Sequence, residues 1–367
     1  MSDIPANRLG LAIDALAATD RPATRARKSV WFTAPLQVEV REELLAEPAA
    51  GQLLVETMAS AVSAGTEMLL YRGEAPAEMA ADVTIGALSG TLAFPLKYGY
   101  ACVGRVIVVG EGLPAGWEGR RVFAFNPHES LLLASPDELI AIPDDVSTED
   151  ALFLASMETA VSLVHDARPL LGERMLVFGQ GVVGLLTTGL LAAHGLSRLV
   201  TLDAFERRRE ASRAMGAHVA LDPQAPDCVR AIAEALGGEA DLALDISGSP
   251  AALTQAMHAM THGGRVVIGS WFGSKPVPLD LGREFHRRRL SLVSSQVSTL
   301  GPALGAAWSK ARRLAVGMDW LGRLHPARLI THRFALDQAP EAYALLDRNA
   351  DSALQVVLTA NTRAAKQ

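Results

Sequence analysis

Cysteine is nearly absent from this chain. Only Cys102 and Cys228 occur in 367 residues, too few for a disulfide framework or for a zinc site built from thiolates. We therefore expect a reducing, cytoplasmic location. No stretch offers the roughly 18 uncharged apolar residues that a membrane span needs, and the N-terminus lacks a basic segment followed by an apolar core. The sequence predicts a protein that is neither secreted nor embedded in a membrane.

An excess of positive charge is missing as well. The formal net charge is -6, and the short arginine clusters near positions 208 and 288 are too local to create a basic field for nucleic acid. A hydrophobic content of 49% with 20% charged residues is ordinary for a globular enzyme, and the length allows two hydrophobic cores. We predict two domains, a small-molecule substrate and no nucleic-acid partner.

A glycine-rich turn is the strongest local signal. Its residues are Gly179, Gln180, Gly181, Val182, Val183 and Gly184. They follow the apolar run 175–178 and precede the apolar stretch 185–193. The order of strand, glycine turn and helix N-terminus is that of the pyrophosphate cradle in a dinucleotide-binding fold, whereas the glycine spacing alone would be weak evidence. The sequence predicts that these six residues bind a dinucleotide cofactor.

A carboxylate follows the next predicted strand. The run 198–202 ends in Asp203, about 20 residues beyond the last glycine, where a carboxylate accepts hydrogen bonds from the adenosine ribose and repels a 2′-phosphate. NAD is therefore the expected cofactor. Arg208 lies between two further arginines and could bind a phosphate, which leaves NADP open. A charge run of this kind is more often a solvated helix face.

The chain changes its pattern along its length. Residues 1–25 carry a short amphipathic helix pattern, interpreted as an N-terminal extension. Residues 29–143 contain short β-rich runs separated by glycine and proline, which predicts a barrel-like domain. Residues 148–295 alternate apolar strands with alanine-rich helices, which predicts a parallel sheet with helices on both faces. The expected fold class is α/β, with a Rossmann doubly wound sheet plus a β-rich barrel.

The C-terminal part returns to a mixed pattern. We predict a long helix at 303–315 and strands at 330–334 and 354–358, which rejoin the barrel. The β-rich domain is therefore assigned to residues 1–147 and 296–367.

Three short segments resemble motifs of the medium-chain dehydrogenase/reductase superfamily. Gly65-Thr66-Glu67 resembles its G-T-D segment, Gly99-Tyr100-Ala101 takes the place of G-H-E, and Gly119-Arg120-Arg121-Val122 is similar to G-D-R-V. Within the superfamily, residues 60–73 and 97–104 look most like a subgroup of bacteriochlorophyllide dehydrogenase-like proteins. The resemblance implies a GroES-like barrel, a Rossmann domain, hydride transfer with a nicotinamide cofactor and a homodimer.

The resemblance breaks at the positions that hold zinc in relatives. Ala64 stands where a cysteine precedes G-T-D, Tyr100 replaces the histidine of G-H-E, and the third ligand position falls near Leu154. A catalytic zinc needs three nitrogen, sulfur or oxygen ligands, and alanine and leucine offer none. We predict that no zinc or other metal is bound.

Without a metal, side-chain donors have to stabilise the developing oxyanion. Tyr100 stands in the place of the lost histidine, and Thr66 matches the residue that relays a proton in zinc-dependent relatives. Both hydroxyls are therefore catalytic candidates; the alternatives are a core tyrosine and a helix-start cap. Glu67 is a third candidate, which could equally hold a backbone amide or a neighbouring hydroxyl.

Two further candidates carry titratable groups. Glu158 aligns, by its distance from Gly179, with a position that touches nicotinamide in relatives. A buried carboxylate there would have a raised pKa and could act as an acid or base, or it could instead serve the helix dipole. His128 follows a predicted strand on a loop at the domain junction, where it could shuttle protons or simply pack.

The ends of two predicted strands supply candidates for the nicotinamide half. Ser247 and Ser270 come at the carboxyl ends of strands, where open α/β sheets bind ligands; ordinary turn serines are the alternative. Trp271 and Phe272 either wall the substrate pocket or serve a dimer interface.

The leading interpretation is a zinc-independent, NAD-linked oxidoreductase acting on an alcohol or carbonyl. Two alternatives stay open. One is an NADPH-dependent alkene or quinone reductase, in which the arginines override Asp203. The other is a non-catalytic dinucleotide-binding protein that kept the fold and lost the chemistry.

Overall fold

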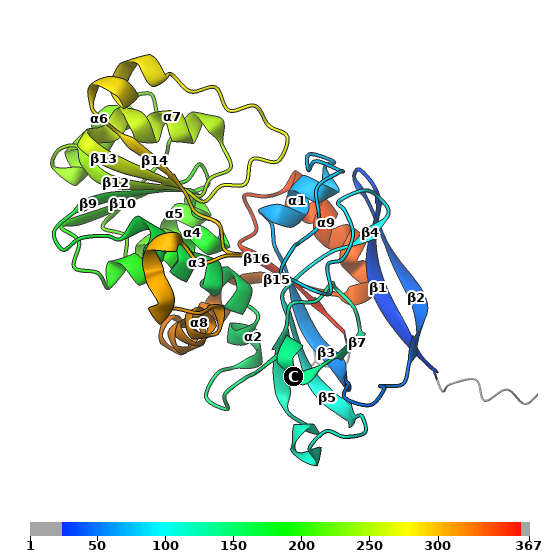
Figure 1. The fold of residues 1–367 in the computed structure, drawn as a ribbon. Helices are drawn as coiled ribbons and strands as arrows, with labels where there is room; N and C mark the ends of the chain where they lie inside the picture. The colour runs from blue at the N-terminus through cyan, green and yellow to red at the C-terminus, as the bar shows by residue number, and fades with distance from the viewer. Residues whose placement is uncertain (1–23, 361–367) are drawn as a thin grey trace, which may run out of the picture.

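Two domains make up the computed structural model, which describes residues 24–360 (Figure 1). The β-rich domain takes its elements from both ends of this range, coloured blue to cyan and orange to red. The other domain, coloured mainly green to yellow, comes from the middle of the chain. The predicted N-terminal helix lies almost entirely in residues 1–23, outside the described residues.

The β-rich domain contains two sheets. One has the strand order β2-β1-β4, and the other has the order β15-β16-β3-β5-β6-β8, with β7 also paired to β3. The pairings are antiparallel, apart from that of β15 with β16. The elements are β1 (Thr24–Ala34), β2 (Gln37–Ala46), β3 (Leu53–Val62), α1 (Thr66–Tyr71), β4 (Leu96–Lys97), β5 (Cys102–Val109), β6 (Arg121–Ala124), β7 (Leu131–Ala134), β8 (Leu139–Ala141), β15 (Ile330–Ala335), α9 (Ala339–Arg348) and β16 (Gln355–Thr359).

Strand β3 shows how the sequence places the site. Val55, Thr57 and Ala59 are buried, whereas Glu56 and Met58 between them are exposed. This period of two turns one face of the strand to the core. The strand ends one residue before Ser63, so its carboxyl end leads directly into the segment that carries Thr66 and Glu67.

The second domain is a parallel sheet of order β11-β10-β9-β12-β13-β14 with helices on both faces (Figure 1). Its elements are α2 (Thr148–Ala151), α3 (Leu154–Ala167), β9 (Arg174–Phe178), α4 (Val182–Ala192), β10 (Arg198–Leu202), α5 (Glu206–Ala214), β11 (Val219–Leu221), α6 (Cys228–Leu236), β12 (Ala240–Asp245), α7 (Pro250–Ala259), β13 (Met260–Ile268), β14 (Ser291–Ser294) and α8 (Lys310–Leu324). The predicted fold class is confirmed. Within residues 24–360 no helix combines the length and the apolar character that crossing a membrane requires.

The region after β14 differs from the prediction. The predicted helix at 303–315 is wrong in its start: residues 302–307 form a 3-10 turn in which Gly305 has φ +63°, and α8 begins only after Ser309, whose Oγ accepts a hydrogen bond from Arg312 N. Helix α8 packs on α3 and α4 of the nucleotide domain. The chain therefore returns to the barrel at β15, later than the boundary at residue 296 implies.

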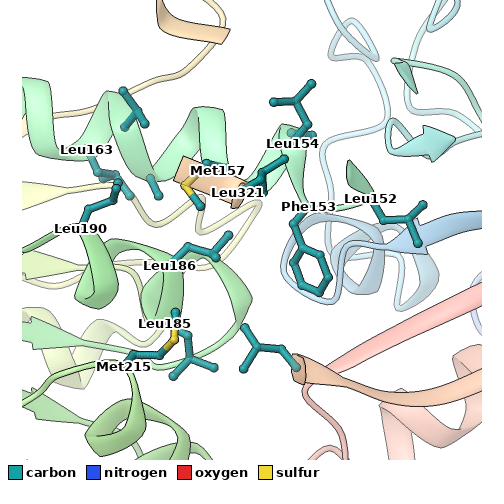
Figure 2. Packing of buried hydrophobic residues seen from close by; sticks show 14 of the residues in the cluster. Leu152, Phe153, Leu154, Met157, Leu163, Leu185, Leu186, Leu190, Met215 and Leu321 are labelled. Atoms are coloured by element: carbon teal, nitrogen blue, oxygen red, sulfur yellow. The ribbon is translucent and has the colours of Figure 1, made fainter. Parts of the chain in front are cut away.

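Helices α3, α4 and α8 share one apolar core with the underside of the sheet (Figure 2). Leu154 and Met157 of α3 lie beside Leu321 of α8, and Leu186 of α4 completes the contact. These four side chains are fully buried, and each such burial contributes about 1.5–3 kcal/mol. The core thereby fixes α3 between the glycine turn at the start of α4 and the last helix of the domain.

Candidate active site

The glycine turn between β9 and α4 is shaped by three different steric demands. A Cβ on Gly179, whose φ is +91°, would lie 2.7 Å from the backbone carbon of Ile246, and a Cβ on Gly184 would lie 2.0 Å from Gly179 O. A Cβ on Gly181 would meet nothing within 4 Å. The first and third glycines therefore allow close backbone packing, and the second faces open space before the N-terminus of α4. This is the arrangement that a pyrophosphate requires.

The other residues of the turn divide into two kinds. Val182 and Val183 are half-buried in the first turn of α4. Gln180 is fully buried, and its side chain donates to Gly179 O (3.0 Å) and accepts from Thr188 Oγ1 (2.9 Å). These bonds of the Gln180 side chain stabilise the shape of the turn. The sequence had predicted Gln180 only as a cofactor contact.

Asp203 lies directly after β10, and each of its carboxylate oxygens accepts a hydrogen bond from a backbone amide. Oδ2 accepts from Gln180 N (2.8 Å) and Oδ1 from Phe205 N (3.0 Å). Arg208 approaches it, with Nη1 3.7 Å from Oδ2, and also donates to Ala350 O. The side chain of Arg208 is only 20% exposed, so the interpretation of this residue as part of a solvated helix face is wrong. The structure places a carboxylate and a guanidinium together at the end of β10.

Three hydroxyls meet at the start of α1, and we call Ser63, Thr66 and Tyr100 the hydroxyl cluster. The phenol of Tyr100 donates to Ser63 Oγ (2.5 Å) and lies 3.3 Å from Thr66 Oγ1. Burial raises the pKa of Tyr100 above its ordinary value, so the phenol is neutral and remains a donor. Thr66 makes no side-chain cap for α1, which removes its structural alternative. Ser63 was missed from the sequence, where its only signal is its place beside Ala64.

The buried carboxylate of Glu67 contacts the hydroxyl cluster through Ser63. Glu67 Oε1 accepts from Ser63 N (2.8 Å), while Oε2 accepts from His128 Nε2 (3.0 Å) and from the hydroxyl of Tyr343. On its other side, His128 Nδ1 is 2.7 Å from Ser60 Oγ. The imidazole therefore joins Glu67 to Ser60. We call Glu67, His128, Tyr343 and Ser60 the carboxylate network.

His128 lies on the loop after β6, where the sequence placed it. The imidazole is enclosed within the barrel and has no exposure to solvent, which favours the packing alternative; its role as a proton shuttle stays a prediction. Its ring lies against Gly99, where an added Cβ would be 2.7 Å from Nε2. The glycine before Tyr100 is therefore needed to admit the histidine. Tyr343, in α9, was not foreseen, because nothing in the sequence links it to Glu67.

Glu158 has a partner that the sequence did not indicate. Its carboxylate lies on α3 and accepts two hydrogen bonds from Arg313 of α8 (3.2 and 2.8 Å). Burial raises the pKa of Glu158, and Arg313 opposes that shift. The carboxylate is held between two helices, and its predicted role as an acid or base at the nicotinamide stays a prediction.

The two candidate serines meet at one edge of the sheet, as their positions after strands imply. Ser247 Oγ donates to Asp245 Oδ1 (2.7 Å), and Ser270 Oγ accepts from Gly248 N (2.9 Å). Asp245 was missed from the sequence. It is fully buried, burial raises its pKa, and Oδ2 has no partner among residues 24–360.

The loop after β13 reaches the barrel. Trp271 packs against the apolar cluster of the β-rich domain, and Ser274 N donates to Glu74 O (2.9 Å). Phe272 instead packs within the nucleotide domain. Trp271 therefore lies at the junction of the two domains.

Comparison with known proteins agrees with this architecture. A family model described as "Zinc-binding dehydrogenase" matches residues 182–315. The zinc-type alcohol dehydrogenase-like protein YphC of Escherichia coli, itself uncharacterized, is 25% identical over 348 residues, covering 84% of this chain and 92% of YphC. The (R,R)-butanediol dehydrogenase of Bacillus subtilis is 30% identical over 203 residues, covering 48% of this chain and 59% of that enzyme. Over residues 182–315 the chain is therefore similar to zinc-binding dehydrogenases, and over most of its length it is similar to a zinc-type alcohol dehydrogenase-like protein.

Solved structures of similar fold include members described as dehydrogenases. The alcohol dehydrogenase RspB of E. coli CFT073, complexed with NADH, superposes with a TM-score of 0.75 at 20% identity, covering 91% of this chain and 99% of RspB. This likeness shows the fold. The narrower resemblance to bacteriochlorophyllide dehydrogenase-like proteins stays a prediction.

The zinc-type family name makes the donor set at the zinc positions important. Leu154 is fully buried in the apolar core of Figure 2, and Ala64 has no donor atom. Tyr100 supplies one phenol oxygen, which is engaged by Ser63. Across residues 24–360 no cluster of three or more His, Cys, Asp or Glu is arranged to hold a metal. The side chains at these positions do not fit the three-ligand zinc site of the family's catalytic type.

A cavity of about 1000 Å³ lies between the barrel and α8. Its wall includes Phe125, Asn126 and Ile140 from the barrel and Lys310 and Leu314 from α8. Neither the hydroxyl cluster nor the glycine turn lines it.

Proposed function

We propose that this chain is an NAD(H)-linked oxidoreductase that converts an alcohol and a carbonyl into one another without zinc. One observation carries the proposal: a neutral phenol, Tyr100, meets two further hydroxyls, and the motif resemblance aligns Tyr100 with a zinc ligand of zinc-dependent relatives. The same molecule carries a glycine turn whose open side at Gly181 suits a dinucleotide. When bound, the nicotinamide supplies or accepts the hydride.

The residues of the chain would divide the remaining work. The glycine turn and the N-terminus of α4 hold the pyrophosphate, and Asp203 accepts from the ribose hydroxyls. With substrate bound, the phenol of Tyr100 would turn its O–H from Ser63 Oγ to the substrate oxygen and so stabilise the negative charge that develops there during carbonyl reduction. Ser63 and Thr66 contact the phenol and can replace the proton that it gives up.

Two features support NAD over NADP as the cofactor. Asp203 is positioned beside the turn by two backbone amides, where its carboxylate would repel a 2′-phosphate. Arg208 lies against this carboxylate and the chain near Ala350 instead of extending from α5 as a free cation.

The test uses the full-length protein and starts with binding. NADH and NADPH are titrated by fluorescence, and the metal content of the same preparation is measured. NAD reduction is then assayed on a panel that includes butane-2,3-diol and L-threonine, the substrate types named for dehydrogenase relatives. We expect NADH to bind more tightly than NADPH and turnover to survive dialysis against a chelator.

The decisive variant is Tyr100→Phe. Loss of the phenol should lower kcat about 100-fold, a typical contribution of a positioned acid, and leave NADH affinity unchanged. Tyr98→Phe is the matched control, because Tyr98 is a buried neighbour whose ring centre is 6.1 Å from that of Tyr100. A requirement for stoichiometric zinc would refute the proposal. Tighter NADPH binding would favour the alkene or quinone reductase, and binding without turnover would favour the non-catalytic alternative.

A further inference from the structure

Arg313 is the largest fully buried side chain in the described part of the molecule, and all five of its N–H donors have acceptors. Nε and Nη2 both donate to Glu158 Oε1, at 3.2 and 2.8 Å. Nη1 donates to Ser162 Oγ (3.2 Å) and Thr299 O (3.3 Å), and Nη2 also donates to Val297 O. A guanidinium that is 1% exposed is held in place only by such a complete set of partners.

These partners belong to three separate segments. Arg313 lies in α8, Glu158 and Ser162 lie in α3, and the two carbonyls lie in residues 295–301, which we call the β14 loop because they follow that strand. A single side chain therefore fastens the β14 loop to the helix pair beneath it. The loop has a second attachment to α3 through Ser295 Oγ, which donates to Asp166 Oδ2 (2.6 Å).

The β14 loop starts at the edge of the sheet where ligands of this fold bind. Strands β13 and β14 are parallel neighbours in register, and Ser295 N donates to Ile268 O (2.9 Å). The loop therefore leaves the sheet beside Ser270, at the carboxyl ends of the strands. Helix α3 also supports that neighbouring loop, because Leu163 packs under Gly269.

We infer that Arg313 is a positioning residue for the nicotinamide half of the cofactor site. Through the carbonyls of Val297 and Thr299 it holds the β14 loop as one wall of that half, while the glycine turn and Asp203 at the other half do not depend on it. This inference rests on the proposed function, since it assumes that a nicotinamide dinucleotide binds along this edge.

Arg313→Lys tests the inference because it keeps the charge and reduces five donors to three. A lysine cannot reach Glu158, Ser162 and both carbonyls together, so the β14 loop should lose its fixed position. The measurement is the ratio of the dissociation constants of NADH and ADP-ribose, determined by calorimetry. ADP-ribose contains the pyrophosphate and adenosine but no nicotinamide. We expect the ratio to rise at least about 10-fold, with ADP-ribose affinity unchanged.

Arg323→Met is the matched control, because Arg323 is on the same helix with a side chain 60% exposed; its ratio should equal that of the wild type. Should Arg313→Lys fail to fold, Glu158→Gln removes the charge opposite Arg313, and Ser162→Ala removes one acceptor. Both variants carry the same measurement, with smaller increases expected. An unchanged ratio in the folded variants, or equal weakening of both ligands, would overturn the positioning role alone. A wild-type protein that binds neither ligand would overturn the proposed function together with this inference.

Discussion

The glycine turn and the hydroxyl cluster are built on opposite principles. The turn is made mostly of backbone: its six residues are contiguous, three of them are glycines, and Gln180 is the residue whose side chain bonds within it. The hydroxyl cluster is made of side chains, and it is supported by the carboxylate network, whose members come from α1, β3, the β6–β7 connection and α9. Binding of the cofactor is thus encoded locally, whereas the predicted proton donors depend on the tertiary structure.

This difference has an energetic side. Substitution of a glycine in the turn disturbs close backbone contacts at one place. The carboxylate network loses its order if any one donor is removed, because an unpaired buried polar group costs about 1–3 kcal/mol. Substitutions in the two regions should therefore differ in what they damage.

The largest effect is expected within the glycine turn, and it separates fold from binding. Gly184→Ala places a Cβ 2.0 Å from Gly179 O. Neither the Cβ nor the carbonyl oxygen can move away by rotation of a side chain, so the variant should lose about 3 kcal/mol of unfolding free energy. Gly181→Ala meets open space and has an ordinary φ of -67°. It should keep wild-type stability while NADH binding weakens by about 2 kcal/mol, roughly 30-fold. Urea unfolding and NADH titration measure the two quantities. Equal stability of both variants would contradict the steric account.

A smaller effect is expected when the carboxylate network is broken at its most distant member. Tyr343→Phe removes one donor to Glu67 but keeps the ring that stacks on Tyr71 and meets Phe32 edge-on. Stability should fall by about 1.5 kcal/mol, the value of a hydrogen bond to a charged group, and kcat should fall with NADH affinity intact. Tyr71→Phe, the stacking partner, is the control for loss of a buried phenol. A Tyr343→Phe variant with normal kcat would show that the hydroxyl cluster does not need the network.

The smallest effect concerns Cys102, which is buried on β5 beside the network's strand β3. Burial raises the pKa of its thiol to about 12, so the thiolate that reacts with alkylating agents is scarce at pH 8. Native protein should show no carboxymethylation of Cys102 by iodoacetate at pH 8, and activity should not change, whereas urea-unfolded protein should react fully. Mass spectrometry of both samples decides. Rapid native labelling would mean that this part of the barrel opens readily.

The contrast between a contiguous turn and a cluster of distant side chains also explains which features could be predicted from the sequence. The pyrophosphate turn, Asp203 and the alternation of strands and helices are short-range patterns, and the structure places all of them where the patterns indicated. Tyr100 and Thr66 were found by their place in family motifs, and they do meet. Ser63, Tyr343, Asp245 and Arg313 were missed because each acquires its importance from a partner far away in the chain.

Helix α8 illustrates the remaining errors. The start of the helix was predicted several residues too early because small apolar residues at 303–307 have a helical spacing. In the structure, the positive φ of Gly305 prevents a regular α-helix there. Glu158 was correctly expected to be buried with a raised pKa, yet periodicity cannot reveal that the facing position on α8 carries a guanidinium.

Tyr343 comes late in the chain, and this has a consequence for biosynthesis. As the polypeptide leaves the ribosome, the parallel sheet has all six of its strands once Ser294 has emerged. Glu67, made much earlier, gains its tyrosine only after α9 has been translated, and β16 then inserts between β3 and β15. The nascent chain can therefore complete the sheet that carries the glycine turn before it completes the carboxylate network, and a ribosome stalled between these two points would carry the first without the second.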